Sequence, residues 1–224
     1  MTLHELPDLI QGTDEWHDQR RGIVTASVIG RLITPSTIKP ANNMESRSLV
    51  ALLVSERITG WTDPSYVGDD MLRGWDDEPR AIEAYSEHFE PVTTDGFLIR
   101  DDWGFRIGYS PDGLVGDNGI VEVKSRRPKK HLQTILGNEV PVENMAQIQC
   151  GLLVSGRDWC DYISYCGGMP LWVKRVRKLA KWQSAIVEAV AAFEEAAEQM
   201  AADYLSAVKG LPETERVIEM EMTF

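Results

Sequence analysis

The stretch from Ser110 to Lys124 constrains the fold of this 224-residue chain more than any other. Its Asp112-Gly113 pair bends the chain between two apolar runs, and residues 119–124 then alternate as a short buried strand does. Because side chains alternate along a strand, Glu122 and Lys124 point to the same face. We expect Asp112, where the neighbouring strand ends, to lean over that face.

This stretch carries residues suited to metal chemistry. An acid on an otherwise apolar strand must be paired or must bind a metal. Asp112 and Glu122 supply carboxylate oxygens, the ligands that Mg²⁺ prefers while it keeps several waters. Lys124 can hold an attacking hydroxide or neutralise charge that builds up on a phosphate. The alternative is a simple turn followed by the solvated face of an edge strand.

Four blocks of the sequence resemble one family of nucleases, in that family's order and at similar spacing. Asp112 followed by Glu122-x-Lys124 resembles the core of the PD-(D/E)xK nucleases. Together the blocks span roughly residues 14–155 and resemble the phage lambda exonuclease (YqaJ-type viral recombinase) family of bacteriophage proteins. The other three blocks are residues 16–27 (WHDQRRGIVTAS), 74–78 (GWDDE) and 145–149 (MAQIQ).

The resemblance implies a fold and a domain organisation. The expected fold is α/β, with a mixed central β-sheet flanked by helices, as in the restriction-endonuclease-like (PD-(D/E)xK) nucleases. We expect a single nuclease domain over residues 1–224, with a loosely held N-terminal arm (1–13) and an acidic C-terminal tail (211–224). A chain of this length is able to bury a core as one domain.

The resemblance also implies an activity. It predicts a Mg²⁺-dependent exonuclease, or one that uses Mn²⁺, that degrades one strand of linear double-stranded DNA in the 5′→3′ direction. The 3′ single-stranded tails would serve recombination by strand annealing. The expected assembly is a homotrimer ring threaded by DNA, with a single-strand annealing protein as partner. An endonuclease or nickase of the same superfamily and a non-catalytic DNA-end-binding protein remain alternatives.

Catalytic roles are carried over onto matching positions. The implied metal ligands are Glu78, Asp112, Glu122 and the backbone carbonyl of Val123. Lys124 would orient the hydroxide for in-line attack.

Gln147 would hydrogen-bond a phosphate oxygen or the nucleophilic water; a polar residue at a helix edge is its alternative. Met71 or Leu72 would serve as an apolar wedge that splits the duplex end, and an ordinary core contact is their alternative.

A pocket for the DNA end is the third implication. In the family, the arginine and serine at the positions of Arg20 and Ser27 hold the 5′-phosphate, and Ser110 would join them. Thr25-Ala26-Ser27 is expected to cap a helix over about 26–33, and a helix N-terminus with a free hydroxyl suits a phosphate. A plain N-cap is the alternative.

The charge is acidic overall but its cations are clustered. A net charge of −12 and a pI near 4.8 speak against non-specific coating of nucleic acid. A metal-dependent nuclease can still focus a positive groove at its site. Arg126 and Arg127, within a basic run over residues 124–130, are candidate DNA contacts, as is the run over 174–181. A solvated face is the alternative for each run.

Other signals narrow the class of protein. No run is apolar and long enough to span a membrane, and the N-terminus lacks the signature of a signal peptide, so we expect a cytoplasmic protein, in the host cytoplasm if phage-encoded. Three cysteines without a Cys-x-x-Cys pair indicate buried free thiols rather than a disulfide framework, a zinc site or an iron–sulfur cluster.

Hydrophobic periodicity predicts the elements. Helices are expected at about 14–20, 26–33, 43–59, 69–89, 129–137, 142–155 and 179–209. Asn43 is expected to cap the helix over 43–59, which should bury Leu49, Leu52, Leu53 and Ile58. The last helix should bury Trp182, Ile186, Val190 and Phe193. One antiparallel meander is expected over 91–94, 97–101, 104–109, 113–116 and 119–124, with turns at Asp95-Gly96 and Asn118-Gly119, followed by a hairpin over 159–166 and 170–177.

Overall fold

The computed structural model describes residues 2–64, 67–94 and 96–216. Its helices are α1 (Asp14–Arg20), the 3₁₀ turn η1 (Ile29–Leu32), α2 (Met44–Thr59), α3 (Asp69–His88), α4 (Pro128–Gly137), α5 (Val142–Ser155) and α6 (Ala180–Ala207). Its strands are β1 (Leu3–Leu6), β2 (Val24–Thr25), β3 (Ile33–Thr34), β4 (Lys39–Pro40), β5 (Val92–Thr93), β6 (Phe97–Arg100), β7 (Ile107–Tyr109), β8 (Gly113–Val115), β9 (Gly119–Ser125), β10 (Trp159–Tyr165) and β11 (Trp172–Arg177).

Two mixed sheets form the centre of the molecule. One has the order β11-β10-β9-β8-β5, and the other has the order β1-β6-β7-β2. Strands β9 and β10 are parallel, as are β2 and β7, and the other pairs are antiparallel. Parallel neighbours need a crossover, and α4 with α5 supply it between β9 and β10. The mixed α/β prediction is confirmed.

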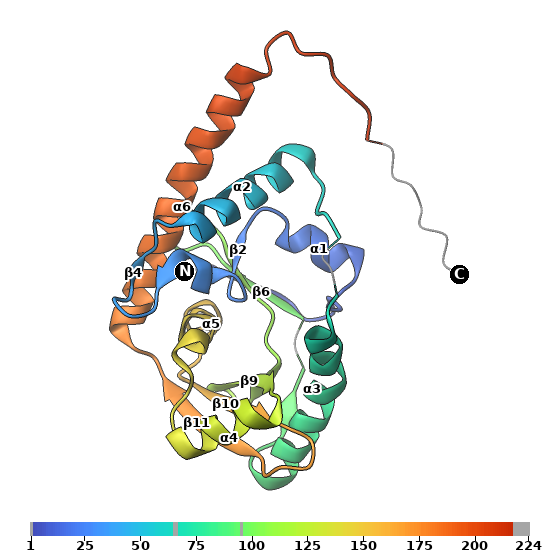
Figure 1. Ribbon diagram of the computed structural model, residues 1–224, viewed down its shortest axis with the longest axis vertical. Coiled ribbons are helices and arrows are strands. Elements are labelled where there is room, and N and C mark those ends of the chain that lie inside the picture. The colour runs from blue at the N-terminus through green and yellow to red at the C-terminus, as the bar shows by residue number, and fades with distance from the viewer. Residues whose placement is uncertain (1, 65–66, 95, 217–224) are drawn as a thin grey trace, which may run out of the picture.

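Helices cover both faces of the β9–β10 pair (Figure 1). One face carries Ile120 and Tyr162, which belong to the main hydrophobic core together with residues of α5 and α6. The other face carries Val121 and Ile163, which pack with Ala81 and other residues of α3. Alternating side chains of β9 therefore pack into two separate hydrophobic cores. Helices also bury the polar side chains of this strand that they cover.

Helices α2 and α6 pack side by side along one flank of the molecule (Figure 1). The stripe predicted on α6 is confirmed, since all four of its residues are buried. On α2, Asn43 caps the helix as expected, and Leu49 and Leu53 are buried. The prediction was wrong for Leu52 and Ile58, which are exposed, because the buried face of α2 is narrower than the apolar stripe.

The predicted meander was wrong in its pairing. Strand β5 pairs with β8, β6 pairs with β7, and neither β5–β6 nor β7–β8 forms a pair. Only the three residues 110–112 connect β7 to β8, and they include Pro111, so the chain passes on into the second sheet instead of folding back. The β8–β9 hairpin loop is residues 116–118, with Gly116 at a positive φ of 48°. The turn expected at Asp95 lies outside the described residues.

Two predictions for the N-terminal region were also wrong. Residues expected to form a loose arm include β1, an edge strand paired with β6. The helix expected over 26–33 is only the short η1, and its N-cap Val28 makes no side-chain capping bond. The cause is that the N–H of Ala26 donates to the carbonyl of Gly108 at 2.8 Å, which prolongs the strand and delays the turn. A helix N-terminus was expected next to Ser27 as a partial positive charge for a phosphate. The structure offers only the single short turn of η1 there.

Other predicted features agree with the structure. The three cysteines are free and buried. None of the described helices combines the length and the apolar character that crossing a bilayer needs. Residues 211–216 of the tail form neither helix nor strand, and residues 217–224 lie outside the described part.

Candidate active site

Asp112 directly precedes strand β8. Because β8 begins only at Gly113, the residues of β9 beyond Val121 have no partner strand on this side. The first strand pair is Gly113 with Val121. Before it, the Asp112 side chain takes the place of the missing strand, and its Oδ2 accepts a 2.7 Å hydrogen bond from the N–H of Val123. Because the N–H and C=O of a strand residue point to the same side, the Val123 carbonyl faces the Asp112 side as well. Two oxygens therefore converge at this edge of β9.

Glu122 and Lys124 sit on the next positions of β9 and share a face. Glu122 is 1% exposed, and its Oε1 lies 2.5 Å from the Nζ of Lys124. Its Oε2 has no hydrogen-bond partner among the described residues. A buried carboxylate oxygen without a partner is costly. Glu122 is therefore held by one ammonium and retains an unused acceptor inside the protein.

Glu78 reaches this site from α3, and a hydrogen-bonded chain ties that helix to β9. Ser125 donates from Oγ to Asp77 at 2.6 Å, and Arg73 donates from Nε to Ser125 at 3.0 Å. Asp77 precedes Glu78, so this link fixes α3 next to the site. The sequence reasoning missed Asp77 and Ser125, although both flank predicted site residues.

The pKa values of the cluster reflect burial and mutual repulsion. Burial, then the charges of Glu122 and Glu78, raises the pKa of Asp112 well above its ordinary value, while Lys124 acts in the opposite direction. Burial and Glu122 likewise raise the pKa of Glu78. Burial disfavours the charge of Lys124, but Glu122 and Asp112 outweigh it and raise the pKa of that ammonium. Lys124 is therefore a cation at neutral pH and acts through its charge.

The donor set fits a hard divalent cation. It offers carboxylate oxygens of Asp112 and Glu122, a strand carbonyl, and the partnerless Oε2 as a ready ligand. Within the described ranges, no three acidic, histidine or cysteine side chains are already gathered closely enough to hold a metal. Glu78, which the charge of Glu122 influences, is the acid that α3 contributes beside this set.

A second cluster surrounds the guanidinium of Arg20. This group donates to Ser27 at 3.2 Å and makes longer contacts of 3.4 Å to Ser110 and 3.5 Å to Thr25. It stacks at 3.8 Å over the ring of Trp16, whose Nε1 donates to Ser110 at 3.0 Å. The structure therefore brings Arg20, Ser27 and Ser110 together. Sequence reasoning missed Trp16 and Thr25, both of which lie in the first resembling block.

Arg20 is a half-buried cation that has no direct counter-ion among the described residues. Burial lowers its pKa to about 10, and the charge of Glu56 acts in the opposite direction. Among the described residues, no carboxylate lies within ion-pair distance of Arg20. Glu56 is itself occupied by the N–H of Gly22, at 2.8 Å. A cation surrounded by hydroxyls forms a site for an anion that can bind to its planar fork.

The two clusters share one short connection of the chain. Ser110 contacts the Arg20 cluster, and Asp112, two residues later, belongs to the carboxylate cluster. Pro111 between them is buried and limits the freedom of the connection. An anion at Arg20 therefore lies close to the carboxylates.

Gln147 and Gln149 occupy different environments on α5. Gln147 is half-buried, and its side chain makes no hydrogen bond to any described residue. Gln149 is fully buried and bonds Arg177 and Leu179 through its side chain, at 2.8 and 2.9 Å. Gln149 is the structural glutamine of this helix, which leaves Gln147 available for a ligand.

Arg126 and Arg127 also differ. Arg126 points inward, where its Nη2 donates to Asn144 at 2.6 Å and to the hydroxyl of Tyr162 at 2.9 Å. Arg127 is exposed and forms a 2.8 Å ion pair with Asp70.

The start of α3 carries exposed apolar side chains. Met71 and Leu72 are 43% and 48% exposed, so the ordinary core contact weighed for them is absent. Trp75, one turn later and not singled out by the sequence reasoning, is 53% exposed. These three residues lie on adjoining positions of one helical face.

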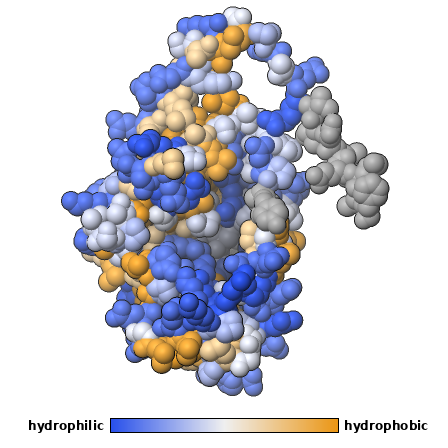
Figure 2. Space-filling view, viewed as in Figure 1, coloured by the Kyte–Doolittle hydropathy of each residue, from blue (hydrophilic) through white to orange (hydrophobic). Residues whose placement is uncertain are grey.

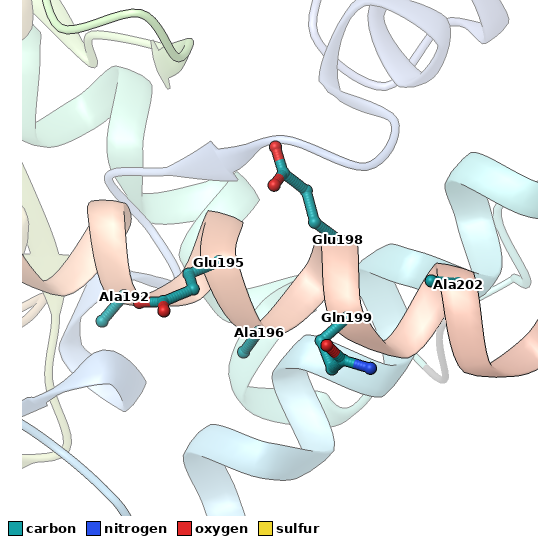
Figure 3. A pocket seen from close by; sticks show the side chains of 6 residues that line it. All are labelled: Ala192, Glu195, Ala196, Glu198, Gln199 and Ala202. Carbon is teal, nitrogen blue, oxygen red and sulfur yellow. The ribbon is translucent and has the colours of Figure 1, made fainter.

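A hollow on α6 is unrelated to these clusters. Figure 3 shows that its lining comes from one helix only, namely Ala192, Glu195, Ala196, Glu198, Gln199 and Ala202. A single helical wall does not enclose a ligand.

Comparison with known proteins agrees with this geometry. The crystal structure of an alkaline exonuclease (LHK-Exo) from Laribacter hongkongensis is similar at 30% identity, over 89% of this chain and 100% of that chain, with a TM-score of 0.78. Its complex with dAMP gives a TM-score of 0.79 over the same shares and at the same identity. A phage-related exonuclease from Haemophilus somnus 129PT is 14% identical over 81% and 96% of the two chains, with a TM-score of 0.62, and shows the fold alone.

These matches confirm the predicted PD-(D/E)xK nuclease fold. A search among curated proteins finds no match. The family model of the YqaJ-like viral recombinase domain matches residues 15–158, a range that includes the Arg20 cluster and the carboxylates. The chain therefore belongs to the YqaJ-like viral recombinase family.

Proposed function

We propose that this protein is a metal-dependent exonuclease that degrades one strand of linear duplex DNA from its 5′ end. The observation that carries the proposal is the junction at residues 110–112. It joins an anion pocket around Arg20 to the acids Asp112 and Glu122. A terminal phosphate in the pocket would place the next phosphodiester at the carboxylates. The relative from Laribacter hongkongensis is an exonuclease and binds dAMP, a nucleoside monophosphate.

The residues of the chain divide the chemistry between them. A divalent cation, Mg²⁺ or Mn²⁺, supplies Lewis acidity and lowers the pKa of water when it is bound by Asp112, Glu122, the Val123 carbonyl and Glu78. Lys124, which stays protonated, stabilises the negative charge that develops on the phosphate and orients the attacking oxygen. The side chain of Gln147, which has no hydrogen-bond partner among the described residues, would donate its amide to a phosphate oxygen.

The Arg20 pocket would bind the terminal 5′-phosphate of the strand in preference to an internal phosphodiester. A terminal phosphate carries more negative charge than an internal phosphodiester, and the guanidinium fork matches two of its oxygens. Ser27 and Ser110 add hydroxyl donors. The exposed Met71 and Leu72 would wedge the duplex end apart, and Arg127 would contact its backbone.

An assembly and a partner complete the proposal. Apolar side chains remain exposed on α2 and α6, among them Leu52, Ile58, Tyr204 and Leu205. Figure 2 shows hydrophobic side chains over this part of the surface. This apolar surface supports self-association, for which we propose a homotrimer ring that retains DNA, and a single-strand annealing protein that receives the 3′ tail.

One digestion series tests the activity. Linear duplexes with a 5′-phosphate or a 5′-hydroxyl, and a closed circle of the same sequence, are incubated with and without Mg²⁺. We expect mononucleotides and 3′ tails from the phosphorylated linear duplex, and only with the metal. Cleavage of the circle at a comparable rate would instead identify an endonuclease or nickase. Binding of ends without any cleavage would identify an end-binding protein.

A further inference from the structure

Tyr109 has a buried hydroxyl that the mechanism above does not use. This residue ends β7, directly before Ser110, and its side chain is 1% exposed. The hydroxyl has no hydrogen-bond partner among the described residues. Such groups are rare in native proteins, because a buried hydroxyl without a partner loses its bonds to water.

Helix α5 confines the hydroxyl end of the ring. A methyl group placed on Gly151 would come within 2.8 Å of Cζ of Tyr109, the ring carbon that bears the hydroxyl. It would approach Cε2 and Cε1 to 3.0 and 3.2 Å. Only a glycine permits this contact, so the phenol is pressed against the backbone of α5 and its hydroxyl is fixed in the core.

Tyr109 packs on the face of the sheet that carries Glu122. Burial is the main cause that raises the pKa of Tyr109, and Glu122 is the largest contributor among charged groups. Cys160, Asp112 and Cys150 follow in that order. Tyr109 belongs to the same hydrophobic core as Ile120 of β9, Cys150 of α5 and Cys160 of β10. Ile120 and Glu122 are two positions apart on β9, so this core covers the face of the sheet that carries Glu122.

Two partnerless polar groups thus occur in one region of the core. Tyr109 offers a donor, and the Oε2 of Glu122 offers an acceptor. The structure shows no direct hydrogen bond between these two groups. Buried waters commonly join such pairs and make two to four hydrogen bonds. The thiols of Cys150 and Cys160 are weak partners that border the same space.

We propose that the hydroxyl of Tyr109 is joined to the carboxylate of Glu122 through one buried water and is thereby a positioning residue for that carboxylate. The water accepts from Tyr109 and donates to Oε2. This bond fixes the plane of a carboxylate that Lys124 holds only through Oε1. Residues behind a metal ligand often set its orientation in this way. The consequence for metal binding rests on the proposed function, but the link between the two residues does not.

The first test is a double-mutant cycle in metal-free protein. Tyr109→Phe removes only the hydroxyl, and Glu122→Met removes both acceptors at similar volume. We expect Tyr109→Phe to lower the melting temperature by about 2–4 °C in the wild-type background, and to leave it unchanged or raise it in the Glu122→Met background. If Glu122→Met does not fold, Glu122→Gln keeps one neutral acceptor, and the shift should shrink to about half.

The second test measures metal affinity without catalysis. Mn²⁺ is titrated into each protein and free Mn²⁺ is followed by electron paramagnetic resonance. Tyr109→Phe should bind Mn²⁺ about ten- to a hundredfold more weakly than the wild type. Tyr85→Phe is the matched control, because it removes another buried hydroxyl, which donates to Asp161 at 2.6 Å on the opposite face of the sheet. It should keep wild-type affinity.

The outcomes separate the two proposals. Additive shifts in the cycle, or a rise in melting temperature for Tyr109→Phe in the wild-type background, overturn the link between Tyr109 and Glu122. Wild-type Mn²⁺ affinity in Tyr109→Phe overturns its positioning role. If the wild type binds no Mn²⁺, the proposed metal dependence fails, and the melting cycle still decides the link.

Discussion

The N–H of Val123 donates to the carboxylate of Asp112 at 2.7 Å, so two residues eleven positions apart are tied just before the start of strand β8. This bond places an acid beside β9 where a neighbouring strand would otherwise continue. Because β8 is short, the edge of β9 beyond Val121 is open to a ligand although helices cover the sheet. The Asp112 side chain accepts the hydrogen bond from Val123 that a longer β8 would have accepted.

The first prediction concerns the charge of Asp112. Asp112→Asn keeps an oxygen that accepts from Val123 and removes the negative charge. Digestion of linear duplex should fall by more than about a hundredfold, because the charge acts on the reacting centre. Binding of duplex should be unchanged or tighter, as measured by gel shift. Asp117→Asn, an exposed acid in the loop over 116–118, is the control and should digest at the wild-type rate. Wild-type digestion by Asp112→Asn would show that the site is wrongly placed.

A second prediction follows from the raised pKa of Asp112. The folded protein holds this proton more tightly than the unfolded chain, so the metal-free protein should lose stability as pH rises. The loss begins near the ordinary carboxyl value of about 3.9 and ends at the raised pKa. Glu78, with its pKa raised by burial, acts in the same direction.

Metal-free melting curves across this window check the sign. The difference between wild type and Asp112→Asn should shift in favour of the variant as pH rises. Mg²⁺ should stabilise the wild type more at higher pH, since it competes with protons for the same oxygens. A difference that does not depend on pH would contradict the assignment of the raised pKa.

The third prediction concerns the Arg20 pocket. Arg20→Ala removes charge-assisted bonds worth roughly 1.5–3 kcal/mol, or about ten- to a hundredfold. The preference for 5′-phosphorylated over 5′-hydroxyl ends should largely disappear, as measured by the ratio of digestion rates. Mn²⁺ affinity should stay at the wild-type value, because Arg20 touches none of the carboxylates.

The same pocket predicts a response to pH and to a conservative change. In the wild type, the preference should fade as pH rises through about 10, where Arg20 loses its proton. Arg20→Lys keeps the charge but loses the fork that Ser27 and Ser110 contact, so it should recover only part of the preference. A wild-type ratio near one would remove the case for a 5′-directed exonuclease.

The fourth prediction separates two adjacent arginines. Arg126→Ala should destabilise the fold by roughly 1–3 kcal/mol, because it removes bonds to Asn144 and Tyr162 in a half-buried site. Arg127→Ala should leave the melting temperature unchanged, since Arg127 and Asp70 are both exposed. It should instead weaken binding to all duplex sequences and reduce the slope of log affinity against log salt by about 1. Equal effects of the two changes on salt dependence would contradict this division.

Much of the local structure could be predicted from the sequence. Asn43 marked the start of α2, and the spacing of Trp182, Ile186, Val190 and Phe193 marked the buried face of α6. These features depend on residues within a few turns of one another, so periodicity and capping are sufficient to show them. The order of the four resembling blocks likewise led to the family without any knowledge of contacts.

The pairing of strands was beyond such patterns. The sequence over 91–124 predicts short strands and turns, but β5 pairs with β8, and residues 110–112 carry the chain between two sheets. Pairing is selected by the packing of whole sheets against α3 and α5, and strands of two or three residues hold little information about their partners.

By itself, the sequence determined which groups are present: Asp112, Glu122 and Lys124 for a metal and a phosphate, and Arg20 for the end of a strand. Only the tertiary structure decided which of them act together. The Nε1 of Trp16 reaches Ser110 across 94 positions, and Arg126 turns inward to Asn144 instead of outward to DNA. Residue type and spacing fix the chemistry of a side chain, but its partners and its pKa depend on burial and on neighbours that the chain brings together only when it folds.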